Sequence, residues 1–291
     1  MTDSRTGVYR IARPTEQLAP IVLDSPHSGM SKPNGFDPIV EETLWKAMCD
    51  PLVDQLFGDA PSLGAPLLMA QFPRVYIDAN RADDDIEPSL FDGWDGPSKP
   101  TEKSELGKGL FWLNIKPDRR PIYASPLTGA EMWHRIKQYH RPYHAALKSL
   151  LDLTQSRFGC VYHINCHSMR RLSGTMDKEG PGKARVDFVI SDRDGTSSEA
   201  GFVACAVEHL RNSGFTVAIN DPFKGAEIVS RSGAPSEDRH SIQIEINRGL
   251  YLERDGLTAS KDFPELKNTL NDWLRAMIRY AKEKTTGIPA V

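Results

Sequence analysis

Two histidines follow short apolar segments of this chain. His27 comes after the run at 20–24, and His167 comes after the β-branched run at 161–164. Apolar runs of this length, continuous or alternating, predict strands with at least one buried face. In an open α/β sheet, ligands bind just beyond the carboxyl ends of the strands. We therefore expect both histidines to lie beside the same cleft.

Two carboxylates complete a set of residues suited to metal-assisted hydrolysis. Asp50 precedes a proline at the predicted start of a helix, and Glu245 lies in the alternating strand predicted at 240–248. Two histidines and one carboxylate are a usual ligand set for a catalytic zinc, which keeps a further position for water. A carboxylate that is not a ligand would then act as general base toward that water. Taken alone, Asp50 could be only a helix N-cap, and Glu245 could face solvent.

Amide, cationic and imidazole groups suited to substrate binding lie elsewhere in the chain. Asn80 and Arg81 follow a strand predicted at 74–78, and the guanidinium could clamp a substrate carboxylate. Both residues could equally form a solvated corner. His140 and His144 have the i, i+4 spacing of a metalloprotease helix, but the residues between them include a proline and no glutamate. We expect a substrate-side or structural role for these two histidines.

Other hydrolytic and nucleotide-binding chemistries find little support. A nucleophilic Cys166 beside His167 is disfavoured, because neighbouring residues of a strand point to opposite faces. The sequence has no GxSxG, P-loop or GxGxxG motif at a strand-to-helix turn. The four cysteines show no CxxC spacing, which indicates reduced thiols in a cytoplasmic protein.

Length and charge limit the class of protein. The chain has 291 residues, 39% of them hydrophobic, and a formal net charge of −3. This length suits one large α/β domain, and the balanced charge gives no indication of binding to nucleic acid or a membrane surface. The sequence contains no bilayer-spanning apolar run and no hydrophobic signal core at its start. We expect a single catalytic domain over residues 1–291.

Helices and strands alternate in the elements that must position these residues. Helical spacing and capping signals predict helices at 41–58, interrupted by Pro51, and at 128–158, 197–213 and 264–282; further strands are predicted at 66–70, 186–191 and 215–219. This alternation predicts a three-layer α/β/α fold with a mostly parallel or mixed central sheet. The long connection at 82–127 contains aromatic clusters, which favours a lid or binding loop over a disordered insertion.

Five short motifs occur in an order typical of one enzyme family. They are SPHSG at 25–29, YIDANR at 76–81, YHRPYH at 139–144, NCHSM at 165–169 and QIEINR at 243–248. Each motif is weak alone, but the series resembles that of the N-formylglutamate amidohydrolases and covers most of the chain. That family hydrolyses N-formyl-L-glutamate to formate and L-glutamate in histidine degradation. The resemblance implies the same activity and a fold related to zinc carboxypeptidases and aspartoacylases.

The resemblance also implies roles for individual residues. His27 and His167 would bind zinc or another divalent metal, and Glu245 would be the general base. The residues expected to bind a small dicarboxylate substrate are Asn80, Arg81, His144 and Arg248.

The third metal ligand is where the chain departs from the zinc carboxypeptidases. Those enzymes take it from a His-x-x-Glu stretch, but Met30 stands three residues after His27. The carboxylate must therefore come from elsewhere. Asp50 is the first choice, with Asp54 as the alternative.

Two other functions are compatible with the same residues. A metal-dependent deacylase or amidase for another N-acyl amino acid or a small peptide would use the same site, with residues 91–112 setting acyl size. A non-enzymatic carboxylate-binding protein would keep the fold without the metal. The complete set of two histidines and a glutamate favours an enzyme.

Overall fold

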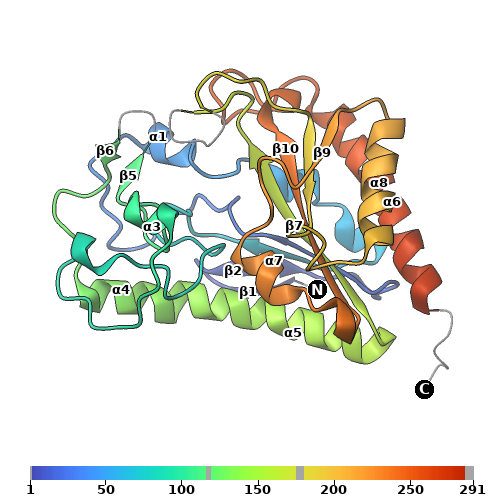
Figure 1. Cartoon of the computed structure of the whole chain (residues 1–291), viewed down its shortest axis with the longest axis horizontal. Helices are drawn as coiled ribbons and strands as arrows, with labels where there is room; N and C mark the ends of the chain where they lie inside the picture. Colours follow the sequence, from blue (N-terminus) through green and yellow to red (C-terminus); the bar gives the residue numbers. More distant parts are fainter. Residues whose placement is uncertain (1, 116–118, 175–179, 286–291) are drawn as a thin grey trace.

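A mixed eight-stranded sheet forms the centre of the computed structural model, which describes residues 2–115, 119–174 and 180–285 (Figure 1). Its strands are β1 (Thr2–Arg5), β2 (Tyr9–Ala12), β3 (Ile21–Ser25), β4 (Leu67–Ala70), β7 (Val161–Met169), β8 (Phe188–Ser191), β9 (Val217–Ile219) and β10 (Arg239–Asn247). They are ordered β1-β2-β4-β3-β7-β10-β8-β9. The pairs β4/β3, β3/β7, β7/β10 and β8/β9 are parallel and the others antiparallel, which confirms the predicted mixed sheet.

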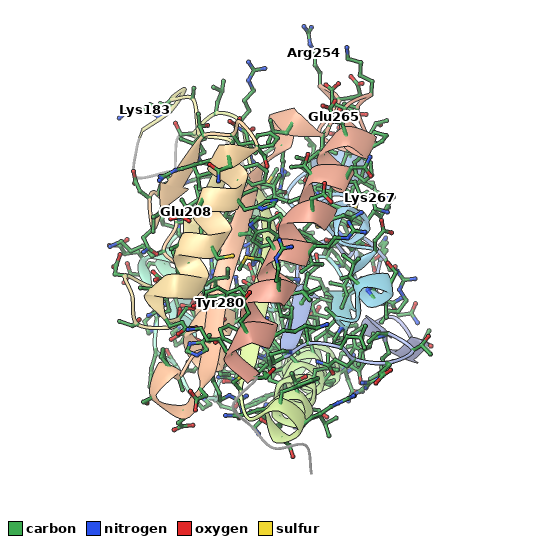
Figure 2. All side chains as sticks on the ribbon, turned by 90° about the vertical axis from the view of Figure 1, so that its right-hand side faces the viewer. Lys183, Glu208, Arg254, Glu265, Lys267 and Tyr280 are labelled. Carbon is green, nitrogen blue, oxygen red and sulfur yellow. The ribbon has the colours of Figure 1, made fainter. Side chains whose placement is uncertain are left out.

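Helices cover both faces of the sheet, as the three-layer prediction requires. On one face, α4 (Gly129–Arg135) continues through a π-helical turn, η3 (Ile136–His140), into α5 (Arg141–Phe158). On the other face, α6 (Ala200–Asn212) and α8 (Phe263–Thr285) lie side by side, with Glu208 and Lys267 on their outer surface (Figure 2). The wide π turn comes just before Pro142, the second residue of α5, which has no N–H to donate to a helical hydrogen bond.

Short elements complete the chain. They are α1 (Glu42–Lys46), α2 (Val53–Leu56), η1 (Ala60–Leu63), η2 (Pro88–Leu90), α3 (Glu102–Glu105), the β5/β6 pair (Asn114–Ile115 and Arg120–Pro121), α7 (Glu227–Ser232), η4 (Pro235–Glu237) and η5 (Arg248–Leu250). Among the helices of the described residues, none combines the length and apolarity that crossing a membrane requires.

The central strands β7 and β10 each have one apolar and one polar face. Ile164 and Ile244 belong to the core cluster that packs against α6 and α8. The alternate positions carry buried polar side chains: His163, Asn165 and His167 on β7, and Ser241, Gln243 and Glu245 on β10. Because side chains alternate across a strand, all six lie on the face toward α5 and α7. The parallel register places Gln243 beside Asn165 and Glu245 beside His167.

Two predicted elements differ from the structure. The segment 74–78 forms a turn instead of a strand, because its apolar residues are buried against the core near α5 while its backbone bonds to the loops. The second helical piece of 41–58 begins at Val53, preceded by Leu52 in a left-handed conformation (φ 62°), so Asp50 is not its N-cap. The carboxylate of Asp50 is therefore free to serve the site.

The connection 82–127 packs onto the core in its described part, which omits 116–118. Its buried aromatic and aliphatic side chains are Ile86, Leu110, Phe111, Trp112, Ile115, Ile122 and Leu127. The expectation of order is met here, and the role as a lid stays a prediction.

Candidate metal centre and active site

Three buried side chains converge at the carboxyl ends of the central strands. The Nδ1 atom of His167 lies 2.9 Å from Oδ2 of Asp50, and Nδ1 of His27 lies 3.5 Å from the same oxygen. One potential ligand atom from each residue lies within 4.8 Å of the other two. The sequence predicted these three residues as metal ligands, and the fold brings them together.

Each member of this group comes from a different element. His27 follows β3, and the backbone N–H of Asp50 donates to the carbonyl of His27 at 2.9 Å. His167 lies inside β7, which runs to Met169, and not in a loop beyond the strand as expected. The expected loop position was wrong because the alternation of the strand continues through polar residues.

The far nitrogen of His27 has a carboxylate partner. Its Nε2 lies 2.7 Å from Oδ1 of Asp78, and the other oxygen of Asp78 accepts from Arg74 at 2.8 and 3.1 Å and from the indole of Trp112 at 3.2 Å. Burial raises the pKa of Asp78, but the charges of Arg74 and the bond to His27 outweigh it and hold that pKa well below its usual value. An ionised Asp78 accepts a hydrogen bond from Nε2–H, which leaves the Nδ1 lone pair of His27 facing Asp50.

The side-chain atoms of His27, Asp50 and His167 are suited to bind a divalent metal. Nδ1 of His27 is buried and has no hydrogen-bond partner among the described residues. Burial raises the pKa of Asp50, but the hydrogen bond with His167 and the proximity of His27 outweigh it and hold that pKa well below its usual value, so the carboxylate is ionised. The free Nδ1 of His27 and the ionised carboxylate of Asp50 face the same point as Nδ1 of His167, and a cation at that point could be bound by all three.

Asp54, the alternative third ligand, lies outside this group. Its backbone N–H donates to the Ser28 hydroxyl, and burial raises the pKa of its carboxyl. The geometry favours Asp50.

Glu245 stands next to His167 in the β-sheet register. Its side chain is 8% exposed, and its Oε1 accepts from the amide of Gln243 at 2.9 Å. Burial raises the pKa of Glu245 to about 7, and the negative charge of Asp50 acts in the same direction. A carboxyl group that exchanges a proton near neutral pH suits a general base.

The predicted substrate-binding residues differ in how much of each side chain is already engaged. Asn80 accepts from the N–H of Ile228 at 2.9 Å and lies 3.0 Å from Nε2 of His167. Arg81 donates to the carbonyl of Asn80 at 2.8 Å and lies 3.9 Å from Asp85.

Arg248 forms hydrogen bonds through all three of its side-chain nitrogens. It donates to Ser168 at 3.0 Å, to the carbonyls of Ala47 and Cys49, and to Asp50 at 2.9 Å. The role of these predicted substrate-binding residues toward substrate stays a prediction.

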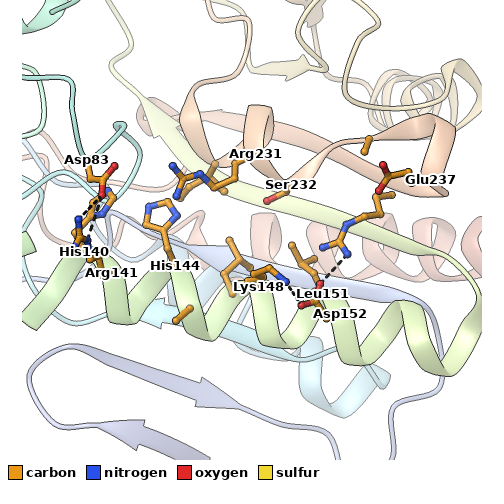
Figure 3. A pocket seen from close by; sticks show the side chains of 15 residues that line it. Asp83, His140, Arg141, His144, Lys148, Leu151, Asp152, Arg231, Ser232 and Glu237 are labelled. Carbon is orange, nitrogen blue, oxygen red and sulfur yellow. Dashed lines mark hydrogen bonds and ion pairs between the residues drawn. The ribbon is translucent and has the colours of Figure 1, made fainter. Parts of the chain in front are cut away.

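His140 and His144 line a groove of about 650 Å³ between α5 and α7 (Figure 3). Their Nε2 atoms bond to the carbonyls of Arg81 and Ala79 at 2.8 Å, so they fasten the segment that carries Asn80. Burial lowers the pKa of His140 to about 4 and that of His144 to about 3. The groove does not include the His27, Asp50 and His167 group, and these contacts favour the structural role for both histidines.

Cys166 faces away from this site, as the strand alternation predicted. It belongs to the core cluster beneath α6 and α8, and burial raises its thiol pKa well above the ordinary value. All four cysteines are free thiols.

The sequence did not reveal the residues that support the group of His27, Asp50 and His167. Asp24, Arg74, Trp112 and Asn165 all contact the ligands or their partners. Asn165 could have been found from the alternation of polar residues on β7. The contacts of Asp78 with Arg74 and Trp112 depend on the turn at 74–78 and on a distant loop, for which the sequence holds no local signal.

Comparison with known proteins gives one consistent result. The family model described as N-formylglutamate amidohydrolase matches residues 19–252. A curated N-formylglutamate deformylase of Pseudomonas putida is 27% identical over 274 residues, 91% of this chain and 94% of that protein. Its counterpart in Pseudomonas aeruginosa is 24% identical over 91% of this chain and 95% of that protein.

Solved structures agree. The crystal structure of N-formylglutamate amidohydrolase from Ralstonia eutropha JMP134 is 40% identical, with a TM-score of 0.90 over 96% of this chain and 99% of that one. The gene product Atu2144 of Agrobacterium tumefaciens shares the fold at 16% identity, with a TM-score of 0.66 over 95% of both chains. This chain belongs to the N-formylglutamate amidohydrolase family.

Proposed function

We propose that this protein hydrolyses N-formyl-L-glutamate to formate and L-glutamate with a divalent metal, zinc being the first choice. The observation that carries the proposal is the buried group of His27, Asp50 and His167, with Glu245 beside His167 on the next strand. The names of the relatives, two deformylases and one amidohydrolase of N-formylglutamate, support the substrate. As part of the same proposal, the reaction serves histidine degradation in the cytoplasm.

Glu245 carries the proton transfers in this proposal. A metal held by His27, Asp50 and His167 supplies Lewis acidity and lowers the pKa of water at the site. Glu245 takes one proton from the attacking water as a new C–O bond forms at the formyl carbon. It then delivers that proton to the amide nitrogen as the C–N bond breaks, which yields formate and the amine of glutamate.

The charge of the substrate sets a second requirement. A dicarboxylate substrate needs cationic partners. Of the two predicted arginines, Arg81 has guanidinium N–H groups left over after its hydrogen bond to the carbonyl of Asn80. We assign Arg81 to a substrate carboxylate. The alternative substrates, another N-acyl amino acid or a small peptide, would use the same metal centre.

The decisive experiment measures metal content and formate release on one purified sample. We expect near-stoichiometric metal, formate release from N-formyl-L-glutamate, and loss of that release with a chelator. Metal binding without formate release, together with cleavage of N-acetyl amino acids, would favour the alternative deacylase. Formate release that persists after metal removal would overturn the metal-dependent reaction.

A matched pair of variants tests Glu245. Glu245→Gln should bind metal normally and lose nearly all turnover, because an amide cannot carry the proton. The same substitution at the exposed Glu253 should leave turnover unchanged. Turnover retained in Glu245→Gln would remove Glu245 from the reaction.

A further inference from the structure

The far nitrogen of His167 lies between two amide groups that offer opposite hydrogen-bonding partners. Nε2 is 2.8 Å from the side-chain oxygen of Asn165 and 3.0 Å from the side-chain nitrogen of Asn80. The first amide can only accept from Nε2, and the second can only donate to it. A neutral imidazole nitrogen can satisfy one of them at a time.

The orientation of Asn165 is fixed by a carboxylate. Its Nδ2 lies 2.6 Å from Oδ1 of Asp24, which also accepts from His163 at 3.0 Å, while Oδ2 accepts from the hydroxyl of Tyr143 at 2.7 Å. Burial raises the pKa of Asp24, but these hydrogen bonds, led by that of His163, lower it below the ordinary value. An ionised carboxylate only accepts, so the nitrogen of Asn165 faces Asp24 and its oxygen faces His167.

The orientation of Asn80 is fixed independently. Its Oδ1 accepts from the backbone N–H of Ile228, at the start of α7, at 2.9 Å. A backbone N–H only donates, so the Nδ2 of Asn80 must face His167.

Each tautomer of His167 therefore has an acceptor for its ring proton. With the proton on Nδ1, the ring donates to Asp50 at 2.9 Å and Nε2 accepts from Asn80. With the proton on Nε2, the ring donates to Asn165 and Nδ1 presents a lone pair beside Asp50 and His27. Only the second tautomer can bind a metal through Nδ1.

We propose that Asn80 and Asn165 are opposed positioning residues that link the tautomer of His167 to metal occupancy. Asn165, oriented by Asp24, stabilises the metal-binding tautomer, and Asn80 stabilises the metal-free one. The inference rests on the metal of the proposed function but not on its substrate. It gives Asn80 a role apart from the substrate contact that the family resemblance implies.

Nitrogen NMR of histidine-labelled protein tests the assignment directly. The His167 signals, identified by their loss in His167→Gln, should show the proton on Nδ1 in metal-free protein and on Nε2 after zinc is added. A proton on Nε2 in both states, or on Nδ1 in both, would overturn the switch.

Two substitutions should move zinc affinity in opposite directions. Asn165→Leu removes the acceptor of Nε2–H and should raise the zinc Kd about 10- to 100-fold. Asn80→Asp keeps the bond to Ile228 but replaces the donor with an acceptor, so the zinc Kd should fall and metal-free His167 should already carry its proton on Nε2. If zinc affinity rose while the proton stayed on Nδ1, the gain would come from the added negative charge alone, and the role of Asn80 would be overturned.

Tyr143→Phe is the matched control. It removes a hydroxyl from Asp24 but leaves the oxygen that faces Asn165, so the zinc Kd should change less than threefold, by roughly 0.6 kcal/mol. A purely structural role of the buried network would instead weaken zinc binding in all three variants. If wild-type protein binds no zinc, the metal of the proposed function fails; if it binds zinc and Asn165→Leu binds equally well, only this inference fails.

Discussion

Nη2 of Arg248 lies 2.9 Å from Oδ1 of Asp50, while Oδ2 of Asp50 faces the two histidines. Arg248 also donates to the carbonyl of Cys49, so it holds both the side chain and the preceding backbone of Asp50. Arg248 therefore contacts Asp50 on the side away from the two histidines, although the family resemblance implies a substrate contact.

Replacing Arg248 distinguishes these roles. Arg248→Met should raise the zinc Kd about tenfold or more, because Asp50 loses its orienting partner, with little change of KM at saturating metal. Arg81→Met should do the reverse, raising KM at unchanged zinc affinity. Chelator competition and steady-state kinetics measure both; a raised KM with normal zinc affinity in Arg248→Met would restore the substrate-binding role.

Asp78→Asn should weaken both the metal centre and the fold. The variant removes the charge that pairs with the partly buried Arg74 and the carboxylate that orients His27. We expect a zinc Kd about 10- to 100-fold higher and a loss of about 3 kcal/mol in the free energy of unfolding. Asp83→Asn, at a half-exposed pair with Arg141, should cost less than about 0.5 kcal/mol. Denaturant unfolding of metal-free protein compares the two, and equal losses would contradict the role of Asp78.

Glu245 should make the stability of the metal-free protein depend on pH. Its pKa is about 7 in the folded protein and 4.5 ordinarily, so folding favours the protonated form. The stabilisation is full below about pH 4.5 and is lost as the pH rises through 7, by roughly 2 to 3 kcal/mol. Relative to Glu245→Gln, the wild type should lose stability over this range. If the free energy of unfolding of both proteins changed equally with pH, folding would not favour the protonated form of Glu245.

His140 has the opposite effect in acid. Burial lowers its pKa from 6.5 to about 4, so its contribution to stability is present above pH 6.5 and is lost as the pH falls toward 4. Between pH 6.5 and 4, the free energy of unfolding of the metal-free His140→Gln variant should fall by about 2 kcal/mol less than that of the wild type. Substituting the exposed His134 in the same way should leave this fall unchanged, and an identical change in both variants would point to a nonspecific effect.

The regular elements were largely predictable, because periodicity reports directly on burial. The strands at β3, β4, β8 and β10 and the long helices appear close to their predicted positions. The prediction failed at 74–78, where an apolar run is buried in a turn. It also ended β7 too early, because polar residues on a buried face look like the start of a loop.

The sequence could predict that His27, Asp50 and His167 belong together, but it could not predict the residues that support them. Histidine and carboxylate are rare enough at strand ends for their chemistry to be informative. Asp50 carried the local signature of a helix cap, and only the tertiary structure shows that its side chain turns to His167. Asp78 and Asn165 are ordinary polar residues in the sequence. Their contacts with His27 and His167 depend on tertiary distances that the local sequence does not encode.

The alternation of β7 and β10 has a consequence for how the chain finds its pairing. A slip of one residue in β7 would exchange the two faces of this strand, placing Ile164 on the side of His27 and Asp50 and His167 in the apolar layer beneath α6 and α8. Burying an ionisable group without partners is costly, and so is wetting an isoleucine. The alternation that gathers His167 and Glu245 on one face therefore also favours the native pairing of β7 and β10, because a shifted register would bury a polar side chain among apolar ones.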